Sequence, residues 1–333
     1  MTKVLKQAPI AKYSRIIAVG GVRGENTVPN SEIVEAIDSS DEWIQSRTGI
    51  KTRARARADE DVLDLATAAA LDVIAKSGID PAEIDTVILS TVTYFHQTPA
   101  GAAIVADRIG ANPAAAFDIS AACAGYCYGI GQADALVRAG TARNVLVIGA
   151  EKMSDFTDPT DRSISFILGD GAGAALVGAS DSPGIGPTVW GSDGSKAPLI
   201  AQTHAWSEYR EGNTEWPTLR QEGPSVFKWA VWGLAPIAQQ ALEAAGVTAA
   251  DIDVFIPHQA NARIIDQLAK QLKLPESVVI AKDIVETGNT SAASIPLATE
   301  RLYRDGKVSS GDLALQIGFG AGLAYAAQVI VLP

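Results

Sequence analysis

Residues 118–129 read DISAACAGYCYG and place Cys123 where an apolar run, 114–119, gives way to a pattern typical of a helix. Small neighbours allow a sharp backbone turn and let a second molecule approach the sulfur closely. A helix that begins at Cys123 would direct free N–H groups at the sulfur and favour the thiolate over the thiol. Unpaired cysteines in apolar company are more often core residues, and Cys127, one turn on, is interpreted as packing. Cys123 is therefore a candidate nucleophile, and other segments of the sequence must provide the evidence for this role.

Helix-like and strand-like segments alternate on both sides of this stretch. Residues 64–77 are a predicted helix ended by Gly78, and residues 84–90 are a predicted buried strand. This alternation is typical of α/β layering with at least partly parallel strands. Residues 183–224, rich in Gly, Pro, Ser and Trp and without clear periodicity, are expected to form a connector with surface loops and flaps.

The chain also repeats itself, which predicts two related halves with a boundary between residues 1–182 and 183–333. Both halves place a small-residue turn between a strand and a helix. Three pairs of segments match in the same order: 77–88 with 245–256 at an offset of 168, Cys123 with Asn289 at an offset of 166, and the glycine-rich segments Gly169–Gly173 with Gly318–Gly322.

If the two halves pack about a pseudo-twofold axis, Cys123 and Asn289 face each other across it. His258 ends the predicted strand before Asn289 and would lie on the same rim, where α/β proteins bind ligands beyond the carboxyl ends of their strands. Taken separately, His258 is more often a core or capping residue and Asn289 a turn residue. Together the three suit acyl transfer, because a cysteine is a strong nucleophile and two N–H donors directed at a thioester carbonyl stabilise an enolate.

Composition restricts the function classes. The 333 residues are 47% apolar with a net charge of −11, which argues against a general nucleic-acid binder but not against docking of an acidic partner. No apolar run is long enough for a membrane span, and residues 1–7 lack a signal core. The two cysteines do not make a disulfide framework, so a cytoplasmic location is expected, and no metal site is predicted. The basic run at 51–57 is interpreted as the solvated edge of a strand.

Two other interpretations stay open at this point. The order Cys123, His258, Asn289 is also that of papain-like proteases, although the Cys-Gly-Ser-Cys-Trp signature is absent and an internal duplication is foreign to that fold. The two Gly-x-Gly-x-Gly segments would belong to a nucleotide-binding module if they cradled phosphates. Neither has Gly-x-Gly-x-x-Gly spacing and each precedes a strand-like run, so tight structural turns are favoured.

Seven motifs in order resemble beta-ketoacyl-acyl-carrier-protein synthase III, the initiating condensing enzyme of bacterial type II fatty-acid synthesis. The resemblance covers essentially the whole chain and implies the thiolase fold: two pseudo-twofold-related α/β halves in a layered α-β-α-β-α arrangement. The motifs are 41–44 (DEWI), 47–50 (RTGI), 121–125 (AACAG), 158–162 (DPTDR), 169–173 (GDGAG), 257–261 (PHQAN) and 288–291 (GNTS).

The resemblance also implies a mechanism. Cys123 takes the acyl group from an acyl-CoA primer, and His258 and Asn289 hold the enolate that decarboxylation of malonyl-acyl carrier protein leaves. The product is a 3-oxoacyl-carrier protein, released with CoA and CO₂. Backbone N–H groups of Cys123 and Ala321 are implied as the oxyanion hole; family members usually carry Gly at the latter position. A related enzyme that primes a polyketide-type pathway is the alternative.

The remaining implied residues contact substrates and partners. No cofactor is implied to be permanently bound, because acyl-CoA acts as a substrate, and a homodimer is implied. Thr98 stands where the acetyl-using type carries a Phe that closes the partner subunit's acyl pocket, so short branched primers are expected to be accepted. Implied contacts are Trp43, Arg47, Arg162, Asn261 and Phe227 for CoA and its pantetheine arm, Lys228, Arg263 and Lys270 for acyl carrier protein, and Thr98 and Phe319 for the acyl pocket.

Overall fold

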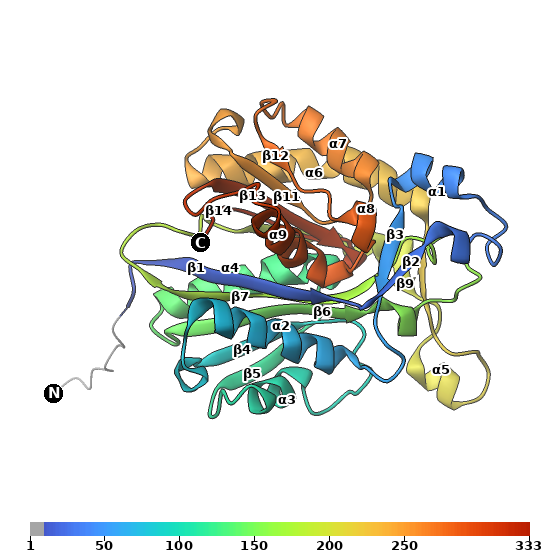
Figure 1. Cartoon of the computed structure of the whole chain (residues 1–333), viewed down its shortest axis with the longest axis horizontal. Helices are drawn as coiled ribbons and strands as arrows, with labels where there is room; N and C mark the ends of the chain where they lie inside the picture. The colour runs from blue at the N-terminus through green and yellow to red at the C-terminus, as the bar shows by residue number, and fades with distance from the viewer. Residues whose placement is uncertain (1–9) are drawn as a thin grey trace.

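The computed structural model describes residues 10–333 and has five layers, in which two β-sheets alternate with three layers of helices (Figure 1). The expectation about residues 1–7 lies outside the described residues. The layered α/β architecture predicted from the alternating pattern is confirmed. The two sheets divide the chain roughly in half, while the boundary at residue 182 itself stays a prediction.

The first sheet has the strand order β1-β7-β6-β4-β5. Strands β4, β5 and β6 run parallel, and β7 pairs antiparallel with both β1 and β6. Because β4 and β6 are covered on both faces, they are continuous apolar runs rather than alternating ones. The strands are β1 (Tyr13–Arg23), β4 (Thr86–Ser90), β5 (Ala115–Ile119), β6 (Asn144–Lys152) and β7 (Asp170–Ser180).

The second sheet repeats this arrangement with the order β8-β14-β13-β11-β12. Here β11 runs parallel to β12 and β13, and β14 pairs antiparallel with β13 and β8. The same order and the same directions in both sheets confirm the predicted duplication. The strands are β8 (Val189–Ser192), β11 (Val254–Pro257), β12 (Val279–Ile280), β13 (Leu313–Gly320) and β14 (Ala324–Val331).

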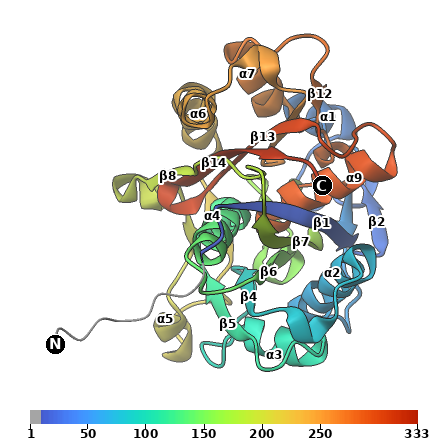
Figure 2. The same cartoon turned by 90° about the vertical axis from the view of Figure 1, so that its left-hand side faces the viewer.

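Helices fill the three layers around the sheets, as the view in Figure 2 shows. α4 and α9 lie between the sheets, α2 and α3 cover the outer face of the first sheet, and α6 and α7 cover the outer face of the second. Each contact between layers is a separate apolar core, and the central one joins Ile130 of α4 to Ile295 of α9. The helices of these layers are α2 (Val62–Ser77), α3 (Gly101–Arg108), α4 (Gly125–Arg138), α6 (Gly223–Ala245), α7 (Ala262–Gln271) and α9 (Ser294–Arg304).

Helix α2 shows how local sequence sets these elements. Asp61 accepts a hydrogen bond from the Asp64 N–H, and the Asp64 carboxylate accepts one from the Asp61 N–H, so a capping box begins the helix. Gly78 ends it in the left-handed conformation, as predicted. Alanines at positions such as Ala66 and Ala69 are fully buried and allow close packing on the sheet.

Near the site, the residues of the two halves that occupy equivalent positions are not the ones that the sequence comparison predicted. Ala122 and Ser291 are both non-glycine residues with positive φ, 45° and 49°, and each begins a 3₁₀ turn, Ala122–Ala124 or Ser291–Ala293, that leads into α4 or α9. This equivalence pairs Cys123 with Ala292, so its pairing with Asn289 was wrong by three residues. Sequence alone favoured the wrong pairing because small residues surround both turns.

The two glycine-rich segments do not correspond, and the tight turn that we expected in each is present only at the end of the second, where Gly322 has a φ of 115° between β13 and β14. Gly171 and Gly173 lie inside β7, whereas Gly318 and Gly320 lie inside β13, the counterpart of β6. A Cβ at Gly173 would lie 2.8 Å from the Pro296 ring, so glycine is needed there for α9 to pack on the sheet. The spacing of glycines in the sequence does not show which strands they belong to or which helix packs on them, so this requirement could not be predicted.

The basic run at 51–57 is not simply a solvated edge. Arg53, in β3 (Thr52–Arg55), is fully buried and donates hydrogen bonds to the Val28 carbonyl of β2 (Asn26–Pro29) and to Asn30. Arg55 lies 3.6 Å from the buried Asp170 carboxylate. The interior carboxylate and carbonyls that accept these guanidiniums come from distant segments, which explains why the local pattern was misleading.

The connector carries more regular structure than its composition indicates. β8 joins the second sheet, and β9 pairs with β10 around the short helix α5. Trp206 of α5 and Trp216 lie against Phe95 of the first half, with ring centroids 5.4 Å from it in each case. The small elements are β9 (Ile200–Gln202), α5 (Trp206–Arg210) and β10 (Leu219–Gln221), together with α1 (Asp41–Thr48) and α8 (Ile284–Thr287) elsewhere in the chain.

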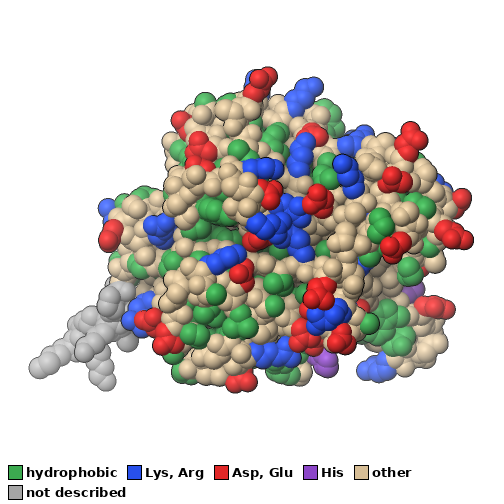
Figure 3. Space-filling view, viewed as in Figure 1, with side chains coloured by type: hydrophobic (Ala, Val, Ile, Leu, Met, Phe, Trp, Pro, Cys, Tyr) green, Lys and Arg blue, Asp and Glu red, His purple; other side chains and the backbone are tan. Residues whose placement is uncertain are grey.

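The described residues form neither a single basic surface nor a membrane-spanning helix, as the composition predicted. Figure 3 shows Lys and Arg interspersed with Asp and Glu over the face that it presents, rather than gathered into one basic stripe. Among residues 10–333, no helix is both long and apolar enough to cross a bilayer.

Candidate active site

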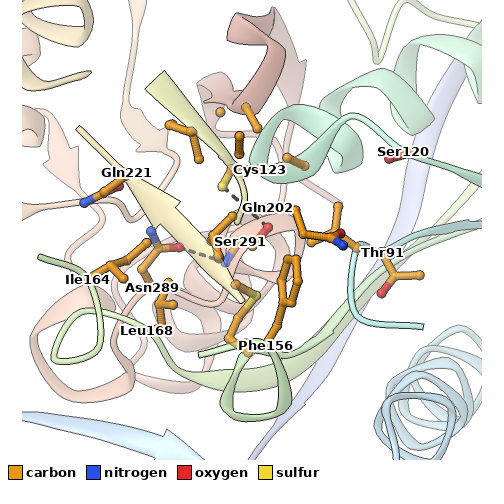
Figure 4. A pocket seen from close by; sticks show the side chains of 18 of the residues that line it. Thr91, Ser120, Cys123, Phe156, Ile164, Leu168, Gln202, Gln221, Asn289 and Ser291 are labelled. Atoms are coloured by element: carbon orange, nitrogen blue, oxygen red, sulfur yellow. Dashed lines mark hydrogen bonds between the residues drawn. The ribbon is translucent and has the colours of Figure 1, made fainter. Parts of the chain in front are cut away.

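A cavity of about 670 Å³ lies where the two halves meet, and side chains of both halves line it (Figure 4). The first half contributes Cys123 from the turn before α4. The second half contributes His258 from the end of β11, Asn289 from the turn before α9, and Phe319 from β13. The three residues that the sequence predicted as a catalytic set therefore open onto one cavity.

Cys123 lies in the 3₁₀ turn rather than at the first position of a regular helix, because α4 begins at Gly125. Its Sγ lies 3.4 Å from Ser291 Oγ (Figure 4). Burial raises the pKa of the Cys123 thiol to about 12, and the nearby Glu151 carboxylate also raises it. Both effects oppose the thiolate that the sequence analysis expected and favour the thiol at neutral pH.

Strand β13 of the second half packs directly on the Cys123 turn. A Cβ added at Gly320 would lie 2.9 Å from the Cys123 backbone nitrogen and 3.2 Å from its sulfur, so a side chain at this position would cover the nucleophile. Ala321 follows at the start of the next 3₁₀ turn and lines the cavity. The backbone N–H groups of Cys123 and Ala321, predicted as an oxyanion hole, belong to these two adjoining turns.

His258 is buried beside the nucleophile's cavity and held from three directions. Its backbone N–H donates to the Ile317 carbonyl at 2.8 Å, its Nδ1 lies 2.7 Å from Ser294 Oγ, and its ring packs edge-on against Phe319 with centroids 5.1 Å apart. Burial lowers the pKa of His258 to about 3, so the imidazole is neutral at physiological pH. A neutral imidazole whose Nδ1 is occupied by a hydroxyl has Nε2 left for a ligand.

Asn289 is oriented by its own turn. Its Oδ1 accepts a hydrogen bond from the Ser291 backbone N–H at 2.8 Å (Figure 4), which leaves the amide NH₂ group as the end available to a ligand. Its backbone is held by the first half, since its N–H donates to the Ile167 carbonyl and its carbonyl accepts from Gly169. The chain thus fixes this donor by bonds that cross the interface between the halves.

Sequence reasoning missed two polar residues behind the nucleophile. Ser291 contacts Cys123, and the fully buried Glu151 accepts a hydrogen bond from Ser291 Oγ at 3.0 Å. A signal for Glu151 existed, because it is a carboxylate that directly follows the otherwise apolar run 145–150. Ser291 is part of the motif 288–291, but serine is common in turns, so nothing in the sequence indicated its contact with Cys123.

The residues implied for CoA form a cluster beside the cavity rather than within it. The guanidiniums of Arg162 and Arg47 lie 5.3 and 5.9 Å from the Trp43 ring, and Asn261 donates to the Arg47 carbonyl. Ile164, two residues after Arg162, and Ala260, next to Asn261, line the cavity, so this cluster lies close to the cavity wall. Phe227, also implied for CoA, lies 5.2 Å beneath the Arg263 guanidinium, and its neighbour Val226 lines the cavity.

The other implied contacts divide between surface and cavity. Lys228 of α6 and Arg263 and Lys270 of α7 are exposed on the outer helical layer of the second half. Phe319 lines the cavity, whereas Thr98 is exposed in the loop before α3 and is not among the residues that line the cavity within a single chain.

Comparison with known proteins gives these features a context. Residues 117–194 match the family model of 3-oxoacyl-[acyl-carrier-protein (ACP)] synthase III, and residues 242–332 match the model of its C-terminal part. The chain is 58% identical over its whole length to a beta-ketoacyl-[acyl-carrier-protein] synthase III from Streptomyces glaucescens, and 53% identical to one from Kocuria rhizophila, each also covered completely.

Solved structures agree with the family models. The priming beta-ketosynthase from the R1128 polyketide biosynthetic pathway superposes with a TM-score of 0.96 at 47% identity, covering 98% of both chains. The 3-oxoacyl-[acyl-carrier-protein] synthase III from Aquifex aeolicus superposes with a TM-score of 0.88 at 38% identity, covering 96% of this chain and 99% of its own.

Two duplicated α/β halves that close on a shared cysteine, histidine and asparagine define a condensing acyltransferase of the thiolase fold. Sequence identity above 50% to relatives that are matched over their whole length assigns the chain to one family within this class. The chain belongs to the beta-ketoacyl-acyl-carrier-protein synthase III family. The papain-like hydrolase and the nucleotide-binding module are thereby displaced as interpretations.

Proposed function

We propose that this enzyme condenses an acyl-CoA primer with malonyl-acyl carrier protein and so initiates fatty-acid synthesis. The observation that carries the proposal is the cavity that Cys123, His258 and Asn289 share, in a chain of this family. The test is to mix the enzyme with an acyl-CoA and malonyl-carrier protein and detect 3-oxoacyl-carrier protein by mass spectrometry. Release of CO₂ without a condensed product would contradict it.

Cys123 forms the acyl-enzyme. The Cys123 thiol gives up its proton as its sulfur attacks the acyl-CoA carbonyl, the C–S bond to CoA breaks, and the CoA thiolate takes up a proton from solvent. The negative charge that develops on the carbonyl oxygen is received by the backbone N–H groups of Cys123 and Ala321, in the adjoining turns described above. Acyl-CoA is consumed as a substrate, and no permanently bound cofactor is needed for this chemistry.

His258 and Asn289 stabilise the enolate. When malonyl-carrier protein loses CO₂, negative charge collects on the thioester oxygen, and two neutral N–H donors stabilise it without transferring a proton. Two features support this role: the His258 imidazole is kept neutral by burial, and Asn289 has its Oδ1 engaged by Ser291, so that its NH₂ group is free to donate. The enolate carbon then attacks the acyl thioester on Cys123, which leaves as a thiolate.

The cluster around Trp43 is proposed as the site for the CoA head group. Arg47 and Arg162 flank one aromatic ring, so they offer cations for phosphates and a stacking surface for adenine. The pantetheine arm would pass Asn261 and Phe227 on its way to Cys123. A cytoplasmic location is also part of the proposal, and the two free thiols Cys123 and Cys127 support it.

The exposed basic residues on α6 and α7 are proposed to dock acyl carrier protein. Asp266 lies between Arg263 and Lys270 on α7 but is paired with Lys282, at 2.7 Å, so the acidic charge of this surface is partly neutralised. A locally basic surface on a protein of net charge −11 would attract an acidic partner in one orientation.

Reversing charge on this docking surface is predicted to weaken the carrier-protein step alone. Lys228→Glu combined with Lys270→Glu should raise KM for malonyl-carrier protein about tenfold at low salt, with less effect at high salt. Acylation by acyl-CoA should be unchanged. The matched control is Lys76→Glu on α2, an exposed lysine of the opposite outer layer. Equal KM effects from Lys76→Glu would refute a local docking surface.

We also propose a homodimer built on β5. This strand lies at the edge of the first sheet, and its outer side is not paired within the described chain, so it offers a template for a second copy. Asp118 of β5 accepts hydrogen bonds from Gly101 and Ala102, which ties the loop containing Thr98 to this edge. A dimer through β5 would therefore bring Thr98 to the partner's cavity.

Thr98 is predicted to admit branched primers. Extra methyl groups are worth roughly 0.8 kcal/mol each when buried, so isobutyryl-CoA should be used alongside acetyl-CoA. Thr98→Phe should reduce kcat/KM for isobutyryl-CoA more than for acetyl-CoA. Measured kcat/KM for both primers tests this, and a preference of the unmodified enzyme for acetyl-CoA above about a hundredfold would overturn it.

A second candidate is priming of a polyketide-type pathway. The observation that favours it is the similarity to the R1128 priming beta-ketosynthase, at 47% identity over nearly the whole chain. Comparison of kcat/KM for malonyl-carrier proteins of fatty-acid and polyketide type distinguishes the two, because the surface on α6 and α7 would match its own carrier protein better.

A further inference from the structure

Acylation of Cys123 needs a group that takes the thiol proton, and the three proposed catalytic residues do not supply one. Burial raises the pKa of Cys123 to about 12, so the thiol is protonated at rest. Burial also lowers the pKa of His258 to about 3, which suits a hydrogen-bond donor and makes it a weak base. The proton must therefore leave by another path.

A chain of hydrogen bonds runs from the sulfur into the first half. Cys123 Sγ lies 3.4 Å from Ser291 Oγ, and Ser291 Oγ lies 3.0 Å from Glu151 Oε1. Ser291 has a single hydroxyl proton. When it donates that proton to the Glu151 carboxylate, its oxygen accepts the proton of the thiol. The chain is thus polarised from sulfur to carboxylate.

Glu151 is a buried carboxylate whose two oxygens have different partners. It is fully buried at the end of β6, and its Oε2 accepts from the Thr93 hydroxyl at 2.8 Å, the Val92 N–H at 3.1 Å and the Thr91 hydroxyl at 3.2 Å. Its Oε1 accepts from Ser291. These three donors hold one oxygen in place and direct the other at the path from Cys123.

The other charged groups nearby are committed elsewhere. On β6 itself, Lys152 pairs with Asp155 at 3.3 Å, and on the neighbouring strand β7, Asp170 pairs with Arg55 at 3.6 Å. Burial raises the pKa of the Glu151 carboxyl to about 7, although the hydrogen bonds that this carboxyl accepts lower its pKa. A carboxyl with this pKa both accepts and returns a proton near neutral pH.

We propose that Glu151, through the Ser291 hydroxyl, receives the Cys123 proton during acylation and returns it after condensation. As sulfur attacks the acyl carbonyl, its proton passes to Ser291 Oγ while the serine proton passes to Glu151 Oε1, which becomes a carboxylic acid. The new C–S bond forms and the bond to CoA breaks. When condensation releases the Cys123 thiolate, the same two transfers run backwards and restore thiol and carboxylate. Glu151 acts through Ser291 and is therefore a positioning residue.

The test follows alkylation of Cys123 by iodoacetamide, by intact mass, across the neutral pH range in the full-length enzyme. The unmodified rate should rise with pH through a midpoint near 7, because only the carboxylate accepts a proton. Glu151→Gln keeps the shape of the side chain and should lower the neutral-pH rate about a hundredfold and remove this midpoint. Ser291→Ala should do the same with Glu151 in place.

Several results would overturn the proposal. If Glu151 merely opposes ionisation of the thiol by its charge, Glu151→Gln will match or exceed the unmodified rate. If Ser291→Ala leaves rate and midpoint unchanged, the path does not pass through Ser291. Should Glu151→Gln fail to fold, Ser291→Ala alone decides the question. Asp134→Asn on α4, a carboxylate that pairs with Arg138, is the control for removal of a negative charge, and its alkylation should match the unmodified enzyme.

This inference rests on the proposed function, in which Cys123 is the nucleophile. The two fail in distinguishable ways. If acyl-CoA does not acylate the unmodified enzyme, the proposed function fails. If it does, and the Gln and Ala variants alkylate at the unmodified rate, only the proton path fails.

Discussion

Cys123→Ala is expected to abolish the acyl-enzyme. In the unmodified protein, mixing with acyl-CoA should add the mass of one acyl group per chain, and in the variant no addition should be detected. The physical reason is that Cys123 is the one thiol among the residues that line the cavity, and a thiol is the nucleophile that the proposed acyl transfer needs. The measurement is intact mass spectrometry after brief exposure to acyl-CoA.

The chain offers a matched control for this experiment. Cys127, the other cysteine, is fully buried one helical turn further along α4 and belongs to the central apolar core. Cys127→Ala removes the thiol of the adjoining helix α4, which does not line the cavity, so this variant should still be acylated. Acylation that persists in Cys123→Ala and disappears in Cys127→Ala would contradict the assignment of the nucleophile.

His258→Ala is expected to separate the two half-reactions. Acylation of Cys123 should continue, while decarboxylation of malonyl-carrier protein should fall by about 10²–10³, the usual effect of losing one donor to a developing oxyanion. Asn289→Ala should give a loss of the same order. The measurement pairs acyl-enzyme mass with release of CO₂ for each variant.

The pH dependence adds a second readout. Since burial lowers the pKa of His258 to about 3, the neutral donor persists far below the ordinary histidine range. Decarboxylation should therefore stay level as the pH falls through that range, and decline only as the pH approaches 3. His204→Ala, at an exposed histidine of the connector, is the control. A sharp loss near pH 6.5 would show that the imidazole titrates normally.

Much of the fold follows from local sequence. Helix α2 has its capping box and terminal glycine, β4 and β11 are short apolar runs with matching approaches, and their alternation determines the layers. The cavity also follows in outline, because Cys123 comes after β5 and His258 directly after β11. The expected strand end at Asn289 was wrong, since this residue follows helix α8 and is held by backbone hydrogen bonds to Ile167 and Gly169. Whether these roles are chemical stays a prediction that the variants above test.

What sequence did not predict depends on contacts between distant segments. The equivalence of Cys123 with Ala292 is set by backbone conformations at Ala122 and Ser291, which side-chain types do not reveal. The raised pKa of the Cys123 thiol depends on burial in the folded protein, where Gly320 of β13 lies against its turn, whereas the nearby sequence indicates only a helix dipole. Glu151 likewise gains its place from donors on the loop after β4 and from Ser291, on the other half.

The central claim is that one cavity joins a nucleophile from the first half to two donors from the second. The most direct measurement is a chase experiment in which the enzyme is loaded with labelled acyl-CoA and then given malonyl-carrier protein, with the labelled peptide identified by mass spectrometry. We predict label on the peptide containing Cys123, lost to 3-oxoacyl-carrier protein in the unmodified enzyme and retained when both His258 and Asn289 are alanine. Label on another residue, or its transfer to product without His258 and Asn289, would contradict the claim.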